Sequence, residues 1–163
     1  MSRAFVREDD GGDEALPDRV PSPHRNFVTR RGLALIDAEI ARLRAAVTEA
    51  GDDRAAVARL TRDLRYLLAR RTSAEPVEPP TDAAAAAFGT AVTLAFADGR
   101  TRTFRIVGED EADPAAGRIA WVSPVARMLL GRAVGDAVDL PAGEAEILAI
   151  DPLPEPDRPN GTP

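Results

Sequence analysis

The fold of this chain is decided by residues Thr29–Thr72, with the sequence TRRGLALIDAEIARLRAAVTEAGDDRAAVARLTRDLRYLLARRT. Large apolar residues recur in both halves of this stretch at alternating spacings of three and four: Leu33, Ile36, Ile40, Leu43 and Val47, then Val57, Leu60, Leu64 and Leu67. This spacing predicts one apolar seam along each of two α-helices. Thr29 is placed to cap the first of these helices.

A short acidic segment, Glu49-Ala50-Gly51-Asp52-Asp53, separates the two halves. Gly51 can adopt the left-handed conformation that ends a helix, and Asp52 or Asp53 can cap the next one. A connection this short returns the chain antiparallel to itself. With arms of about 18 to 20 residues at about 1.5 Å per residue, we expect a rod about 27 to 30 Å long with acids at its tip.

The second half has a different pattern, in which short runs of alternating apolar and polar residues follow one another. Two such runs flank Asp98-Gly99, a strong signal for a two-residue hairpin turn between antiparallel strands. Ser123-Pro124 predicts the start of a short helix. Further short strands are expected over 118–122, 138–140 and 146–150. The chain is therefore predicted to be α+β, an N-terminal antiparallel helical hairpin followed by a small, mostly antiparallel sheet domain with one short helix.

The composition suggests how the parts are divided. We expect a disordered tail over 1–26, the hairpin over 27–73, a proline-containing linker over 74–87, the C-terminal domain over 88–151 and a flexible tail over 152–163.

Charge and residue usage exclude several classes of function. The net charge is −6 and the pI is near 4.9, which argues against general nucleic-acid binding and against sequence-specific DNA contact. The chain has no Cys, so disulfides, thiolate metal sites and Cys nucleophiles are excluded. It also lacks a run of about 18 apolar residues and the apolar core of a signal peptide, so we expect a soluble cytoplasmic protein without membrane contact.

Several blocks of the second half occur in an order that is typical of a known family. They are Phe88-Gly89, Phe104 to Asp113, Ser123 to Arg127 with Leu129-Leu130-Gly131, Val134-Gly135-Asp136 and Pro141 to Glu144. Together they resemble the C-terminal domain of the bacterial Gre transcription factors, GreA and GreB with their relative Rnk. Upstream, Val28 to Leu33 resembles the entry to the coiled-coil hairpin of that family.

The resemblance implies an FK506-binding-protein-like (FKBP-like) C-terminal domain that docks on the rim of the secondary channel of RNA polymerase. It implies that the coiled coil enters this channel, where tip carboxylates help the polymerase to hold a second Mg²⁺ and to cleave the 3′ end of backtracked RNA. The candidate tip acids are Asp52, which matches by position, with Asp53 and Glu49; the candidate docking residues are Ser123, Pro124 and Arg127. The factor itself would have no catalytic centre, no cofactor and no permanently bound metal.

The tip departs from the family pattern. Cleavage factors have Gly-Asp-Leu-Ser-Glu-Asn-Ala-Glu-Tyr or a close variant there, whereas Gly51-Asp52 is followed here by Asp53-Arg54-Ala55-Ala56 in a shorter hairpin. An Asp that precedes the Ser-Pro in cleavage factors is replaced by Val122. Two interpretations stay open: a factor that stimulates cleavage, and an Rnk-like regulator that occupies the channel, competes with other channel factors and cleaves nothing.

The tip acids and the expected fold each have a further interpretation. Helix capping alone explains acids at the start of a helix, so Asp52 and Asp53 need no metal-binding role. A peptidyl-prolyl isomerase is suggested by the expected fold, but fold is a poor guide to activity and aromatic residues make up only 4% of the chain.

Overall fold

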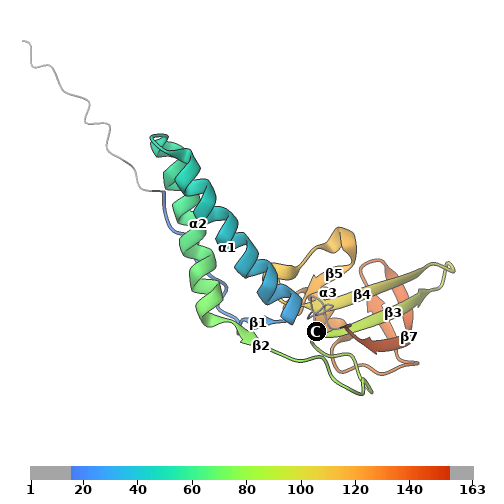
Figure 1. Cartoon of the computed structure of the whole chain (residues 1–163). Coiled ribbons are helices and arrows are strands. Elements are labelled where there is room, and N and C mark those ends of the chain that lie inside the picture. Colours follow the sequence, from blue (N-terminus) through green and yellow to red (C-terminus); the bar gives the residue numbers. More distant parts are fainter. Residues whose placement is uncertain (1–15, 155–163) are drawn as a thin grey trace, which may run out of the picture.

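The computed structural model describes residues 16–154 and consists of a helical arm joined to a small sheet domain (Figure 1). The helices are α1 (Arg30–Ala50), α2 (Arg54–Ser73) and α3 (Pro124–Leu129), with two 3₁₀ turns, η1 (Glu109–Glu111) and η2 (Pro114–Ala116). The strands are β1 (Phe27–Val28), β2 (Glu75–Pro76), β3 (Thr90–Phe96), β4 (Thr101–Val107), β5 (Arg118–Ala120), β6 (Ala137–Leu140) and β7 (Gly143–Pro152). The predicted α+β class is confirmed.

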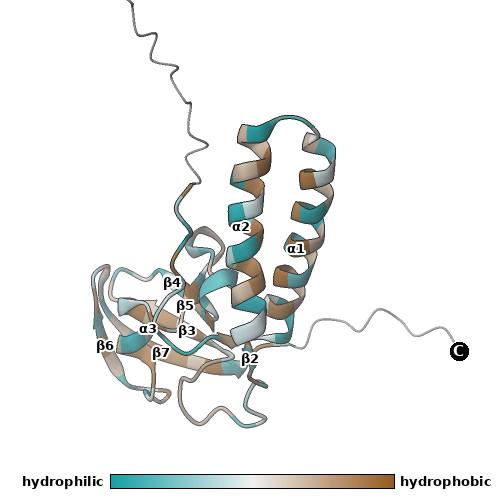
Figure 2. Ribbon diagram, turned by 90° about the vertical axis from the view of Figure 1, so that its left-hand side faces the viewer, coloured by the Kyte–Doolittle hydropathy of each residue, from teal (hydrophilic) through white to brown (hydrophobic). Residues whose placement is uncertain are grey.

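The arm is the antiparallel hairpin that the apolar spacing predicts. The hydroxyl of Thr29 caps α1 by accepting a hydrogen bond from the amide of Gly32 at 2.8 Å. Ile36, Ile40 and Leu43 are buried, and the apolar residues of the two helices face each other in Figure 2. The helices have 21 and 20 residues, which at about 1.5 Å per residue gives an arm about 30 Å long.

The sheet domain is built around one curled five-stranded sheet with strand order β5-β4-β3-β7-β6. Its core is formed by alternate residues of the central strands together with Ala126 and Leu129 of α3. Three strand pairs are antiparallel, as expected, but β4 and β5 are parallel. The reason is the connection between them: η1 and η2 carry the chain back along the sheet, so that β5 runs in the same direction as β4.

The turn between β3 and β4 differs from the prediction. The amide of Phe96 donates to the carbonyl of Arg100 at 2.9 Å, and the amide of Gly99 donates to the carbonyl of Phe96 at 2.9 Å. These bonds close a three-residue loop, Ala97-Asp98-Gly99, with Gly99 at φ 83°. The two-residue turn is therefore wrong, because Gly99 occupies the left-handed position of a bulge at the end of the loop.

Two features of the segments that flank the hairpin were not evident from the sequence. β1 and β2 pair in parallel, joining the entry and exit of the hairpin. Ala86, which the sequence placed in the linker, is 3% exposed in the core of the sheet domain. Its amide donates to the carbonyl of Arg132 at 2.8 Å, so the sheet domain takes in the end of the predicted linker.

The N-terminal segment preceding β1 runs along α2 (Figure 1). Arg65 donates to the carboxylate of Asp18 at 2.6 Å, and the guanidinium of Arg19 lies 4.1 Å from the centroid of the Tyr66 ring. Asn26 is 4% exposed, and its side-chain amide donates to the carbonyl of Arg70 at 2.7 Å. The disorder predicted for 1–26 thus differs from the structure at Asn26, and its part over 1–15 lies outside the described residues. The flexible tail predicted over 152–163 differs at Pro152, which ends β7, and at Leu153, whose amide donates to the carbonyl of Gly89 at 2.8 Å; its part over 155–163 lies outside the described residues.

Among residues 16–154, no helix is both long and apolar enough to cross a membrane.

Candidate functional site

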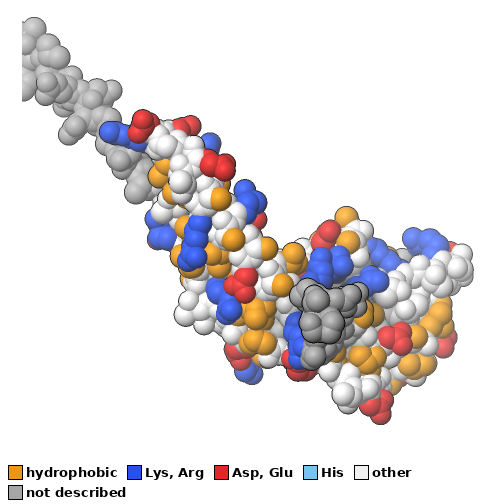
Figure 3. Space-filling view, viewed as in Figure 1, with side chains coloured by type: hydrophobic (Ala, Val, Ile, Leu, Met, Phe, Trp, Pro, Cys, Tyr) orange, Lys and Arg blue, Asp and Glu red, His pale blue; other side chains and the backbone are white. Residues whose placement is uncertain are grey.

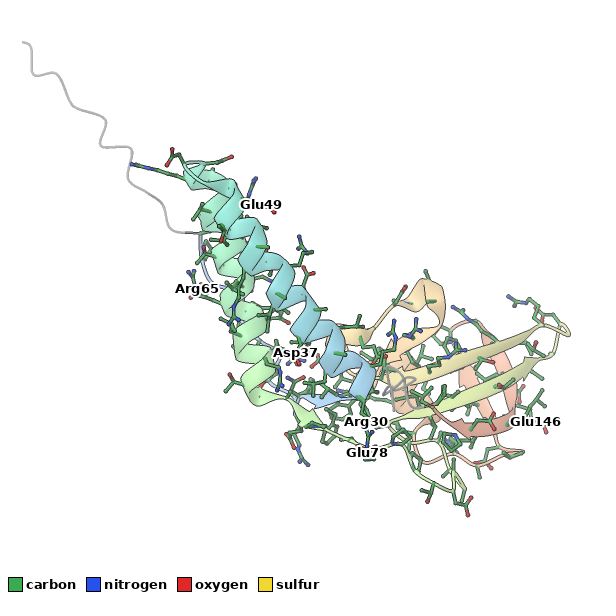
Figure 4. The ribbon with its side chains drawn as sticks, viewed as in Figure 1. Arg30, Asp37, Glu49, Arg65, Glu78 and Glu146 are labelled. Atoms are coloured by element: carbon green, nitrogen blue, oxygen red, sulfur yellow. The ribbon has the colours of Figure 1, made fainter. Side chains whose placement is uncertain are left out.

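The hairpin tip lies at the far end of the arm from the sheet domain, and it presents the predicted acids to solvent (Figures 3 and 4). α1 ends at Ala50, Gly51 adopts φ 51°, and α2 begins after Asp53. Glu49, Asp52 and Asp53 are all exposed. Gly51 is needed here because its positive φ is strained for residues with a side chain.

The three acids differ in what they contact. One carboxylate oxygen of Asp53 accepts a hydrogen bond from the amide of Ala56 at 2.9 Å, so Asp53 is the cap of α2. Within residues 16–154, Glu49 and Asp52 have no hydrogen bond or ion pair from their side chains. Asp52 and Glu49 are therefore the carboxylates that are open to an external ligand, while Asp53 keeps one oxygen in the cap.

Carboxylate oxygens are the ligands that Mg²⁺ prefers, so the donor set at the tip fits this ion chemically. However, no group of three or more His, Cys, Asp or Glu in the described part of the chain is arranged to hold a metal. The tip acids alone thus form no metal site among the described residues.

The orientation of the arm is fixed at its base by Arg70 of α2, which is 1% exposed. Its Nε donates to Asp110 at 2.6 Å, and its Nη2 lies 3.5 Å from a carboxylate oxygen of Glu109. Both acids belong to the loop after β4, so this buried cluster joins the second helix of the arm to the sheet domain. Removing one partner of a buried ion pair leaves the other charge uncompensated.

The first helix is held by the next acid of the same loop, Glu111, which is 6% exposed. Its carboxylate accepts hydrogen bonds from the hydroxyl of Thr29 and from Nη1 of Arg31, the latter at 2.9 Å. A Cβ at Gly32 would lie 2.9 Å from a Glu111 oxygen, so a larger residue there would require the Glu111 carboxylate to shift. The acidic loop thus contacts both helices of the hairpin.

The predicted docking residues lie at the start of α3 on the sheet domain. The hydroxyl of Ser123 caps this helix by accepting from the amide of Ala126 at 3.2 Å. Pro124 and Arg127 are exposed, whereas Ala126 and Leu129 point into the core. The corner therefore offers Pro124 and Arg127 to a partner, and Ser123 holds the backbone beneath them.

The sequence did not reveal the roles of Arg70, Asp110 and Glu111. The available signal was the run of three acids at 109–111, which was assigned only to a loop. The pairings with Arg70 and Arg31 connect residues 40 and 80 positions apart, and nothing in the local pattern relates such positions.

The structure is thus that of an α+β protein with a projecting helical arm, which ends in an exposed acidic tip and is joined to the sheet domain through the ion pairs of Arg70. Comparison with known proteins specifies the class further. The family model described as "Transcription elongation factor, GreA/GreB, C-term" matches residues 81–152. GreB of Yersinia pestis is 34% identical over 143 residues, covering 74% of this chain and 84% of that protein. The chain belongs to the GreA/GreB family.

Other relatives match a smaller part of this chain. GreB of Neisseria meningitidis serogroup A is 41% identical over 98 residues, covering 56% of this chain and 60% of that protein, so the chain spans somewhat under two thirds of such a relative. Among solved structures, the GreA/GreB factor of Nitrosomonas europaea is 17% identical with a TM-score of 0.39 and covers 78% of this chain and 98% of its own. The family assignment rests on the sequence relatives.

Proposed function

We propose that this protein is a transcription elongation factor that binds bacterial RNA polymerase in the cytoplasm and inserts the α1–α2 hairpin into the secondary channel. The observation that carries the proposal is the arm itself: two helices of 21 and 20 residues project from the sheet domain and end in exposed acids. Membership of the GreA/GreB family supports the same role.

We propose that the tip acts on the polymerase active site by completing the coordination of the second Mg²⁺. In two-metal phosphoryl chemistry, that ion stabilises the attacking and leaving oxygens of an in-line displacement. Asp52 and Glu49 are suited to supply oxygen ligands because their side chains are exposed, and Asp53 can add its second oxygen while it caps α2. The outcome would be hydrolysis of the 3′ end of a backtracked transcript.

The docking surface in this proposal is the α3 corner on the sheet domain. Pro124 and Arg127 are exposed there and would contact the rim of the channel, with Ser123 holding the helix start. Contact at the rim and at the active site would fix the depth to which the arm enters.

One observation favours a second candidate, an Rnk-like regulator that occupies the channel without stimulating cleavage. Asp53 already uses one carboxylate oxygen in the helix cap, and the cleavage motif after Gly51-Asp52 is absent from the sequence. A ligand that is misplaced by about 1 Å no longer coordinates a metal. A short hairpin in which Asp53 caps α2 can therefore occupy the channel without completing a metal site.

The test adds purified protein and Mg²⁺ to backtracked elongation complexes and follows the length of the RNA 3′ end. A decrease in cleavage of at least tenfold with Asp52→Ala or Glu49→Ala supports the cleavage role. Glu146→Ala is the control and should leave cleavage unchanged, because Glu146 is exposed on the sheet domain and lies far from the tip (Figure 4). Unchanged transcripts, with binding that displaces another channel factor, support the second candidate. Failure to bind core polymerase in a pull-down contradicts both.

A further inference from the structure

A pocket at the junction between the arm and the sheet domain brings four arginines together. It has a volume of about 100 Å³ and is lined by Arg30 and Arg31 from the start of α1, Arg105 from β4 and Arg118 from β5. Basic side chains gather beside the base of the arm on the face shown in Figure 3. This junction pocket is distinct from the tip and from the α3 corner.

Its positive charge is only partly balanced. Glu111 is the one acid that lines the pocket among the described residues, and its side chain is 3% exposed. It pairs with Arg31 at 2.9 Å and lies 4.0 Å from Nε of Arg118. Arg30 pairs with Glu78 at 3.0 Å outside the pocket lining (Figure 4). Among residues 16–154, Arg31, Arg105 and Arg118 therefore share one buried carboxylate in the pocket lining.

The arrangement of Arg105 and Arg118 is costly in the absence of an anion. The two residues are register partners on β4 and β5, so their side chains leave the sheet next to each other. Like charges at opposed positions of a sheet are destabilising. The guanidinium of Arg105 has no carboxylate within ion-pair distance among residues 16–154. An anion in the pocket would remove this repulsion.

The chemistry and the size of the pocket limit which anion fits. Guanidinium groups bind phosphate through paired N–H donors, and the dipole at the start of α1 adds positive potential. The pocket volume of about 100 Å³ leaves room for one or two phosphate groups beside these donors.

We propose that the junction pocket binds a phosphate or pyrophosphate group, either as the free anion or as the terminal phosphates of a nucleotide. Arg30 and Arg31 belong to the arm, and Arg105 and Arg118 belong to the sheet domain. A bound phosphate therefore connects the two parts and stiffens the junction that sets the direction of the arm. Whether the pocket binds phosphate does not depend on whether the tip stimulates transcript cleavage.

The test is isothermal titration calorimetry of the full chain with inorganic pyrophosphate, inorganic phosphate and adenosine triphosphate at constant ionic strength without divalent cations. Arg105→Gln and Arg118→Gln should each weaken binding by about tenfold, because each removes a charge-assisted hydrogen bond. Arg132→Gln is the matched control, since Arg132 is exposed and lies outside the pocket. Free pyrophosphate binding as tightly as the nucleotide identifies the free anion, and tighter nucleotide binding identifies the terminal phosphates.

Thermal unfolding separates a binding role from a structural one. Without added anion, Arg105→Gln should unfold at the same or a higher temperature than the wild type, because the repulsion with Arg118 is removed; with pyrophosphate, only the wild type and the control should gain stability. The proposal is overturned if pyrophosphate produces neither heat nor a shift, if chloride at equal ionic strength produces the same shift, or if Arg132→Gln loses as much binding as Arg105→Gln.

Discussion

The two aspartates of the hairpin tip are neighbours in the chain, but only Asp53 supports the fold. Its carboxylate caps α2 through the amide of Ala56, whereas Asp52 is exposed and caps nothing. We predict that Asp53→Ala lowers the free energy of unfolding by about 1 kcal/mol and that Asp52→Ala changes it by less than about 0.5 kcal/mol. Urea denaturation measures both.

Asp53→Asn is the control for this prediction, because Asn keeps a side-chain oxygen for the cap. It should be close to the wild type in stability. Equal losses from Asp52→Ala and Asp53→Ala would contradict the separation of roles.

Tyr66 is the only tyrosine in the chain, so its ionisation can be followed without interference. Burial and the nearby carboxylate of Asp110 raise the pKa of its phenol above the usual value of 10.0. The unfolded chain therefore ionises first, and the folded state loses stability as the pH rises above about 10. Ultraviolet absorbance titration should give a higher midpoint for the folded protein than in urea, and Asp110→Asn should lower the folded midpoint; equal midpoints in buffer and in urea would contradict the shift.

At this scale, local chemistry was predictable and distant pairing was not. Thr29, Asp53 and Ser123 are caps because each precedes a helix and carries a side-chain oxygen, a relation contained within three residues of sequence. The burial of Arg70 depends on Glu109 and Asp110, which arrive from another domain. Charged residues on helices are usually exposed to solvent, and Arg is buried only when it is paired. The sequence alone does not show that such partners lie close to Arg70.

At the scale of elements, the hairpin followed from the spacing of its apolar residues because an α-helix converts that spacing directly into a face. The strand pairing was harder. β1 and β2 have two residues each, too few to show alternation, and they pair only because the hairpin brings its two ends together. The parallel pairing of β4 and β5 likewise depends on two 3₁₀ turns, for which the sequence has only weak signals.

The apolar seam of the hairpin gives a prediction for local stability. Ile40 is 6% exposed in the seam, whereas Leu35 on the same helix is 42% exposed. Ile40→Ala should destabilise the hairpin by about 2 to 5 kcal/mol because it leaves a cavity, and Leu35→Ala should cost less than about 0.5 kcal/mol. Amide hydrogen exchange should show loss of protection in α1 and α2 with Ile40→Ala while β3 and β7 stay protected.

A uniform loss of protection in both domains would contradict this, because it would mean that the hairpin and the sheet unfold as one unit. Leu35→Ala is the matched control for the removal of apolar atoms from α1.

At the scale of the whole molecule, the proposed function requires a fixed direction of the arm, and the acidic loop at 109–111 contacts both of its helices. Glu109 and Asp110 hold α2 through Arg70, and Glu111 holds α1 through Arg31 and Thr29. Charged groups at a domain junction give directional contacts, whereas apolar contacts alone permit sliding. The loop thus relates the docking corner to the tip, although it touches neither.

We therefore predict that Arg70→Met reduces function without any change at the tip. Met has a similar volume but leaves the carboxylates of Asp110 and Glu109, which are 15% and 23% exposed, without this guanidinium. The lost charge-assisted hydrogen bond should cost about 2 to 3 kcal/mol. Because the lost contacts lie between the domains, small-angle X-ray scattering should show a broader range of arm directions, and binding to polymerase should weaken. Arg70→Met combined with Asp110→Asn should recover part of the stability, since the unpaired charge is removed.

Arg71→Met is the matched control, because Arg71 is exposed and pairs with Asp37 within the hairpin. If both single variants behave alike, the Arg70 cluster does not direct the arm, and the contacts of Glu111 with Thr29 and Arg31 must hold the junction.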